Sequence, residues 1–73
     1  MTADEALGLA RATAMGEGWP WKEPARVRRL RVGILFGRAR WEVWTNADSL
    51  GSNVRIVIDE RTGQILEKRF LPR

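Results

Sequence analysis

The spacing of the apolar residues changes once along the chain, and this change constrains the fold more than any other feature. Up to Ala14 the apolar residues recur at intervals of three and four, as on one side of an amphipathic helix. From Val27 onward they alternate with polar residues, as in strands that bury one face. The sequence therefore predicts an α+β fold, with one N-terminal helix packed on a four-stranded antiparallel sheet.

The helix is predicted to cover about residues 3–15. Thr2 and Glu5 have the spacing of a capping box, in which each side chain accepts a hydrogen bond from the other residue's backbone amide. Small residues dominate the apolar stripe and would let the helix lie close to a sheet. The stripe consists of Ala3, Leu7, Ala10 and Ala14, with Ala6 beside them. Gly16 and Gly18 are expected to end the helix, because glycine adopts the left-handed conformation at little cost.

The segment after the helix is a connector, since Pro20 and Pro24 exclude regular structure. It carries two tryptophans, Trp19 and Trp21. They either close one end of the core or form exposed contacts with a partner. Because so small a domain has little else to close its ends, packing against the core is favoured.

Four strands are predicted, at about residues 27–36, 39–45, 53–59 and 64–71, joined as a meander. A two-residue turn at Gly37 and Arg38 would join the first two. This turn pairs Ile34 with Trp41 and Val32 with Val43, which puts the apolar residues of both strands under the helix. It also puts Arg31 opposite Trp44 on the other face.

The third strand is predicted to point Val54, Ile56 and Ile58 inward. Asp59 would then begin a turn in which its carboxylate accepts backbone amides before Gly63. Pairing Ile58 with Leu66 places Phe70 near Val54, and it sets Lys68 opposite Ile56. A lysine can extend past a sheet edge to reach water.

Length and composition restrict the possible functions. The 73 residues predict a single domain, 1–73, near the lower size limit for a stable core. The chain has no cysteine and no histidine, which removes the commonest catalytic base and the favoured zinc ligands. The carboxylates Asp48, Asp59 and Glu60 are not forced into one dry pocket. Loop 46–53 lacks the glutamate that closes a calcium loop. We therefore expect no enzyme, catalytic residue, metal or cofactor.

The basic residues suggest a partner. Thirteen Lys and Arg against nine Asp and Glu give a net charge of +4, which solubility alone can explain. However, aromatic and arginine residues together are typical of protein-binding hot spots. The predicted contact residues on the face away from the helix are Trp44, Arg31, Arg40, Arg55, Leu35 and Val57, with Ile65 as a further candidate. Two alternatives are that the arginines bind nucleic acid, or that those of the first strand prevent edge-to-edge association.

The order of elements and two motifs resemble PepSY-like domains. The motifs are the Trp41-Glu42-Val43 strand and the hairpin over residues 54–66, which contains Asp59, Thr62 and Gly63. PepSY-like domains occur in bacterial peptidase propeptides and in cell-envelope proteins. The resemblance implies a non-enzymatic module that binds, and in some cases inhibits, a partner protein. Small toxin-immunity proteins have a similar layout and are a further alternative.

Partner and location follow from the same expectations. The partner would be another protein or, in a homodimer, a second copy of the chain. No segment is apolar for long enough to span a membrane. A cytoplasmic location is expected if Met1 is the native start, and the cell envelope or the exterior if a leader has been removed.

Overall fold

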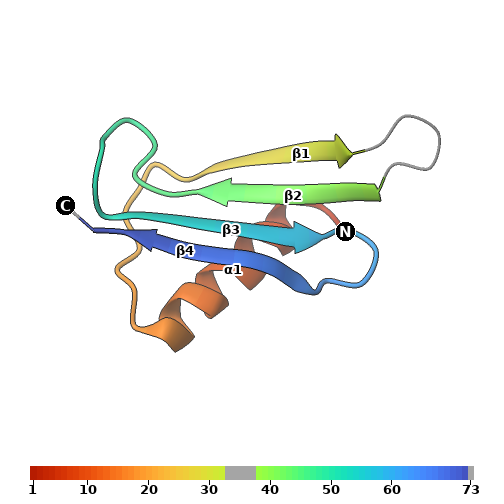
Figure 1. Ribbon diagram of the computed structural model, residues 1–73, viewed down its shortest axis with the longest axis horizontal. Coiled ribbons are helices and arrows are strands. Elements are labelled where there is room, and N and C mark those ends of the chain that lie inside the picture. Colours follow the sequence, from red (N-terminus) through yellow and green to blue (C-terminus); the bar gives the residue numbers. More distant parts are fainter. Residues whose placement is uncertain (33–37, 73) are drawn as a thin grey trace.

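One helix is followed by four strands that form a single antiparallel sheet (Figure 1). The computed structural model describes residues 1–32 and 38–72. The elements are α1 (Ala3–Glu17), β1 (Arg26–Val32), β2 (Arg38–Trp44), β3 (Asn53–Asp59) and β4 (Ile65–Leu71). The strands lie in the order β1-β2-β3-β4, so the predicted α+β meander is confirmed.

Helix α1 begins as predicted but ends later. Thr2 and Glu5 form the complete capping box, and the Glu5 carboxylate accepts from the Thr2 amide at 2.8 Å. Gly16 lies inside the helix, in contrast to the prediction, and Gly18 alone terminates it. The φ angle of Gly18 is 75°, and its amide donates to the carbonyls of Ala14 and Met15. A single left-handed glycine is therefore sufficient to end the helix.

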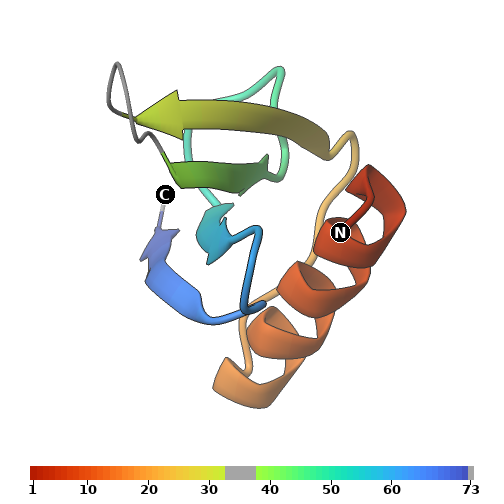
Figure 2. The same ribbon diagram turned by 90° about the vertical axis from the view of Figure 1, so that its right-hand side faces the viewer.

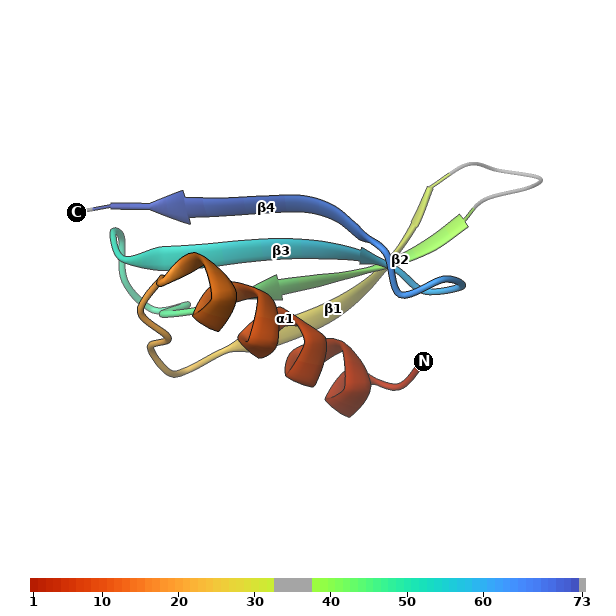
Figure 3. The ribbon, with the colours of Figure 1, turned by 90° about the horizontal axis from the view of Figure 1, so that it is seen from below.

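Three alanines bring the helix close to the sheet. Ala6, Ala10 and Ala14 are completely or almost completely buried, whereas Leu7 is half-buried and the predicted stripe residue Ala3 is exposed. The buried residues recur every four positions, and the helix lies along one face of the sheet over β1, β2 and β3 (Figures 2 and 3). Ala3 lies one turn before the start of this contact.

We expect Ala10→Leu to lower the free energy of unfolding by about 1–3 kcal/mol, because the longer side chain would push the helix off the sheet. The matched control is Ala12→Leu, which adds the same atoms to an exposed position of the same helix. Urea denaturation of both variants measures the difference. Equal stability of the two would mean that the helix does not pack on the sheet through this stripe.

The core lies between this stripe and the inner sheet face, where Val43, Val54, Ile56 and Ile58 are fully buried. Trp19 and Trp21 are half-buried and pack against it. The ring of Trp19 stacks on Phe70 with centroids 6.1 Å apart, and the Arg11 guanidinium lies over Trp21 at 5.4 Å. The connector tryptophans thus close one end of the core, as the sequence favours.

The predicted register of the first two strands is wrong. Val43 pairs with Val27 instead of Val32, a shift of five residues, and Trp41 pairs with Arg29. Arg38 belongs to β2, which is incompatible with the two-residue turn at Gly37 and Arg38, and Ile34 lies outside the described residues. Because the shift is odd, the faces of β1 are exchanged. Val27, Arg29 and Arg31 lie on the helix side, and Leu30 lies on the other.

Contacts of the connector explain this register. The amide of Asn46 donates to the Lys22 carbonyl at 2.8 Å, and that of Ala47 donates to the Pro24 carbonyl at 3.1 Å. These bonds hold the connector against the loop that follows β2, which brings residue 26 beside residue 44. Local alternation of apolar residues contains no information about this contact.

The last two strands follow the prediction except at one bulge. Val54 pairs with Phe70 and Ile56 with Lys68, as expected. Ile58 pairs with Ile65 rather than Leu66, because an irregularity between Val57 and Ile58 shifts the register by one. The Lys68 ammonium leaves the apolar face at this sheet edge and forms an ion pair with Glu17.

Candidate protein-interaction surface

The helix covers one face of the sheet and leaves the opposite face, here called the outer face, uncovered by any helix of the described residues (Figure 2). Most of the charged strand residues lie on the outer face. Strand pairing and alternation assign the residues of this face. It consists of Arg26, Arg28 and Leu30 from β1, Arg38, Arg40, Glu42 and Trp44 from β2, Arg55, Val57 and Asp59 from β3, and Glu67, Arg69 and Leu71 from β4.

A chain of ion pairs crosses the outer face with one residue from each strand. Arg28 contacts Glu42 at 3.0 Å, Glu42 contacts Arg55 at 2.8 Å, and Arg55 contacts Glu67 at 2.8 Å. The Glu42 side chain is only 15% exposed, whereas that of Arg28 is 68% exposed. Charges of alternating sign therefore neutralise one another along the row, and a partly buried network is more stable than isolated surface pairs.

Arg55 is central to this network. Burial alone lowers the pKa of the Arg55 guanidinium, but its hydrogen bonds to Glu67 and Glu42 outweigh this effect and raise the pKa above its ordinary value. Its charge is thus fixed and already paired with two carboxylates. Val57 pairs with Glu42 on one side and Glu67 on the other, and it is only 3% exposed although it is on the outer face.

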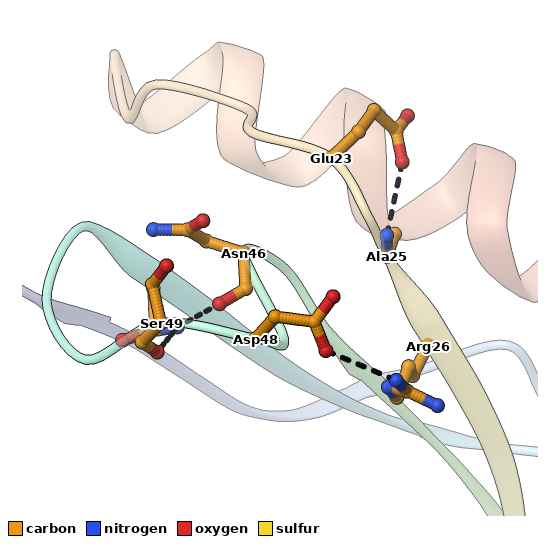
Figure 4. Close-up of polar contacts among 7 residues, drawn as sticks. Glu23, Ala25, Arg26, Asn46, Asp48 and Ser49 are labelled. Carbon is orange, nitrogen blue, oxygen red and sulfur yellow. Dashed lines mark hydrogen bonds and ion pairs between the residues drawn. The ribbon is translucent and has the colours of Figure 1, made fainter.

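A hollow beside Trp44 is the part of the outer face best suited to accept an apolar group. Its lining residues are Arg26, Val27, Arg28, Glu42 and Trp44. The Trp44 ring remains partly exposed. Arg26, directly opposite Trp44 in the register, forms an ion pair with Asp48 at 3.1 Å (Figure 4). We call this site the Trp44 hollow.

The loop between β2 and β3 fixes the position of the Trp44 hollow. Asn53 is buried, and its amide nitrogen donates to the carbonyls of Thr45, Asn46 and Ser49, while its oxygen accepts from the Gly51 amide. The amide of Ser49 donates to the Asn46 carbonyl at 3.0 Å, and Asp48 extends to β1 (Figure 4). These contacts fix the loop at the C-terminal end of β2.

The same contacts account for the oxygen-bearing side chains of this loop. Asn53 is engaged with backbone groups, and Asp48 with Arg26. Within residues 1–32 and 38–72, no group of three or more Asp and Glu side chains lies together as a metal site. The end of the connector is held similarly, because Glu23 accepts a hydrogen bond from the Ala25 amide at 2.9 Å (Figure 4).

Asp59 has the predicted structural role. Its Oδ1 accepts from the amides of Arg61 at 2.8 Å and Thr62 at 3.2 Å, ahead of Gly63, whose φ angle is 74°. Hydrogen bonds from the backbone of Thr62 and Arg61 lower the pKa of this carboxyl, and the charge of Arg38 adds to the effect. Asp59 organises the turn between β3 and β4.

The structure brings together four of the six predicted contact residues. Trp44, Arg40, Arg55 and Val57 lie on the outer face, as β2 and β3 alternate in the predicted way. Arg31 is not opposite Trp44: it pairs with Ala39 on the helix side, and Arg26 takes the expected place. Leu35 lies outside the described residues. Ile65 also faces the helix side, where it packs against the core.

Sequence reasoning overlooked Glu42, the residue that links Arg28 to Arg55. Its position between the inward residues Trp41 and Val43 places it on the outer face, so strand alternation could have identified it. Arg40 was identified, and it is half-buried with an Nε that has no hydrogen-bond partner among the described residues.

Comparison with known proteins leaves the family open. No protein-family model, curated protein or solved structure matches the chain. No helix within the described part of the chain is long and apolar enough to cross a membrane.

Proposed function

We propose that this chain is a non-enzymatic, PepSY-like module that binds another protein through the Trp44 hollow. The order of a helix and a four-stranded meander supports the assignment, as does the Asp59 turn of the closing hairpin. Modules of this kind act by binding a partner protein, and such binding can inhibit the partner.

The observation that carries the proposal is a partly exposed tryptophan beside a hollow, next to a row of ion pairs that crosses the sheet. Tryptophan and arginine are enriched in binding hot spots, where their large side chains fill well-packed, desolvated pockets. Arg26 and Arg28 flank Trp44, with side chains 69% and 68% exposed. The hollow thus fits an apolar side chain of a partner segment, with the two exposed guanidiniums at its rim.

The paired charges argue against nucleic acid at the Trp44 hollow. Phosphate binding requires cations that are free to neutralise phosphates. Glu42 already engages Arg28 and Arg55, and Glu67 engages Arg55 as well. Stacking platforms for single strands also use several aromatic rings, whereas Trp44 is the one aromatic on the described outer face.

We expect Trp44→Ala to weaken partner retention about 30-fold, corresponding to about 2 kcal/mol for a hot-spot tryptophan. The free energy of unfolding should change by less than about 1 kcal/mol, because the residue lies outside the core. Immobilised wild-type and Trp44→Ala protein would be compared for capture from a cell extract, with quantitative mass spectrometry as the readout. Leu50→Ala is the matched control, since Leu50 is 96% exposed and distant from the core.

Two outcomes would contradict the proposal. One is equal retention of every captured protein by the wild type and Trp44→Ala. The other is unfolding of Trp44→Ala, which would make the residue part of the core. Sedimentation of the wild-type protein addresses self-association. A dimer that Trp44→Ala dissociates would identify the partner as a second copy of the chain.

A further inference from the structure

A second positively charged site lies at the other end of β2, away from Trp44. Residues from β1, from the start of β2 and from the turn after β3 line one open hollow. Its charged residues, which define the arginine hollow, are Arg29, Arg31, Arg38, Asp59, Glu60 and Arg61. Four guanidiniums against two carboxylates leave an excess of two positive charges in this small region.

Both carboxylates of the arginine hollow are already engaged. Arg29 donates to one Glu60 oxygen from Nη2 at 2.7 Å and from Nε at 3.2 Å. Asp59 accepts the two backbone amides of its own turn. Both carboxylates therefore already have hydrogen-bond donors. Among the described residues, Arg29 is the only arginine that forms an ion pair with either of them.

The other three arginines, Arg31, Arg38 and Arg61, are exposed and form no ion pair with the described residues, which include every Asp and Glu of the chain. Most basic residues on the rest of the described chain are paired instead. Arg11, Arg26, Arg28, Arg55 and Lys68 all have a carboxylate partner. Lys22, Arg40 and Arg69 form no ion pair either, but they come from three separate segments and do not line this hollow. Three of the six unpaired basic side chains among the described residues therefore line one hollow.

We propose that the arginine hollow binds a phosphoryl group. Guanidinium groups present planar pairs of donors that match phosphate oxygens, and charge-assisted bonds of this kind are about twice as strong as neutral ones. Arg31 approaches the hollow from the helix side of the sheet, Arg38 from the outer side and Arg61 from the turn after β3. An anion in the hollow would lie next to all three segments without displacing Glu60 or Asp59. The site is separate from the Trp44 hollow, and it goes beyond the protein-binding function proposed above.

Two sources could supply this chemistry. One is a small phosphorylated molecule, and the other is the phosphodiester backbone of a nucleic acid. Pyrophosphate is a suitable probe for the first, and a short single-stranded oligonucleotide is suitable for the second. Binding of either should fall steeply as salt rises, because phosphate contacts release bound counterions.

The test is calorimetric titration of the protein with each probe at low ionic strength. We expect Arg38→Gln and Arg61→Gln each to weaken binding about tenfold, the effect of losing one charge-assisted hydrogen bond. Arg69→Gln is the matched control. It removes the same charge from an exposed β4 residue that forms no ion pair with the described residues and does not line the arginine hollow. Its binding should stay within about twofold of the wild type.

The two probes distinguish the sources. Loss of pyrophosphate binding in the hollow variants supports a small phosphorylated ligand, and loss of oligonucleotide binding alone supports a phosphodiester. The proposal is overturned if neither probe binds, or if Arg69→Gln weakens binding as much as the hollow variants, since net charge alone would then explain it. Because these variants leave Trp44 untouched, failure here does not affect the protein-binding proposal.

Discussion

Trp41→Ala should lower the free energy of unfolding by about 3 kcal/mol, at the low end of the range for truncated buried aromatics. Trp41 packs against the core between Arg29 and Ile58 but is only half-buried, and its Nε1 is buried without a hydrogen-bond partner. Because the substitution also removes the unpartnered N–H, it offsets part of the free energy of unfolding that is lost with the ring. Because the core of a domain this small supplies only about 3–5 kcal/mol, the variant should be largely unfolded.

Trp41→Phe separates the two contributions. Phenylalanine retains most of the ring and has no N–H to leave unpaired, so this variant should lose much less stability than Trp41→Ala. Urea denaturation followed by circular dichroism measures both. A stable, folded Trp41→Ala protein would show that Trp41 is not part of the core and that the faces of β2 are wrongly assigned.

Asn53→Asp should cost about 3–5 kcal/mol, the typical effect of an uncompensated buried charge. The native side chain is 1% exposed, and its amide nitrogen points at three carbonyl oxygens. The substitution keeps the shape of the side chain but places a carboxylate oxygen against these acceptors. The loop between β2 and β3 would lose its central donor, and with it the support of the Trp44 hollow.

A matched variant and a pH series test this interpretation. Asn46→Asp makes the same change where the side chain donates a single bond, to the Gly51 carbonyl, and should cost less. Burial raises the pKa of the introduced carboxyl in the folded Asn53→Asp protein. Its deficit relative to the wild type should therefore shrink as pH falls and the group becomes a protonated donor. A deficit that is independent of pH would argue against buried charge as the cause.

Most of the fold could be predicted from the sequence because local signals specify it. The capping box defines the start of α1, and strand β3 has the predicted bounds, with Val54, Ile56 and Ile58 inward. Each of these features depends on residues close together in the chain. The bulge at Val57 is a local irregularity that shifts one pair, and periodicity alone does not reveal it.

The register of β1 could not be predicted in this way, because residues distant in sequence determine it. Alternation extends from Leu30 through Phe36 and is compatible with several pairings. The bonds from Asn46 to Lys22 and from Ala47 to Pro24 select one of them. The residues Gly37 and Arg38 favour a two-residue turn, but the connector contact overrides this local preference.

The same reasoning explains the outcome for the candidate site. Trp44, Arg55 and Val57 were placed correctly because β2 and β3 alternate regularly. Arg31 was misplaced because its face depends on the β1 register. The arginine hollow was not predicted, since its residues come from three segments that only the folded sheet brings together.

Cross-strand nuclear Overhauser contacts in the unmodified protein test most directly the pairing on which both proposed sites depend. The structure predicts contacts between the backbone protons of Val27 and Val43, and between those of Arg29 and Trp41. Contacts joining Val32 to Val43 would contradict it. Such contacts would place Arg31 opposite Trp44, and they would separate the residues that line each of the two hollows.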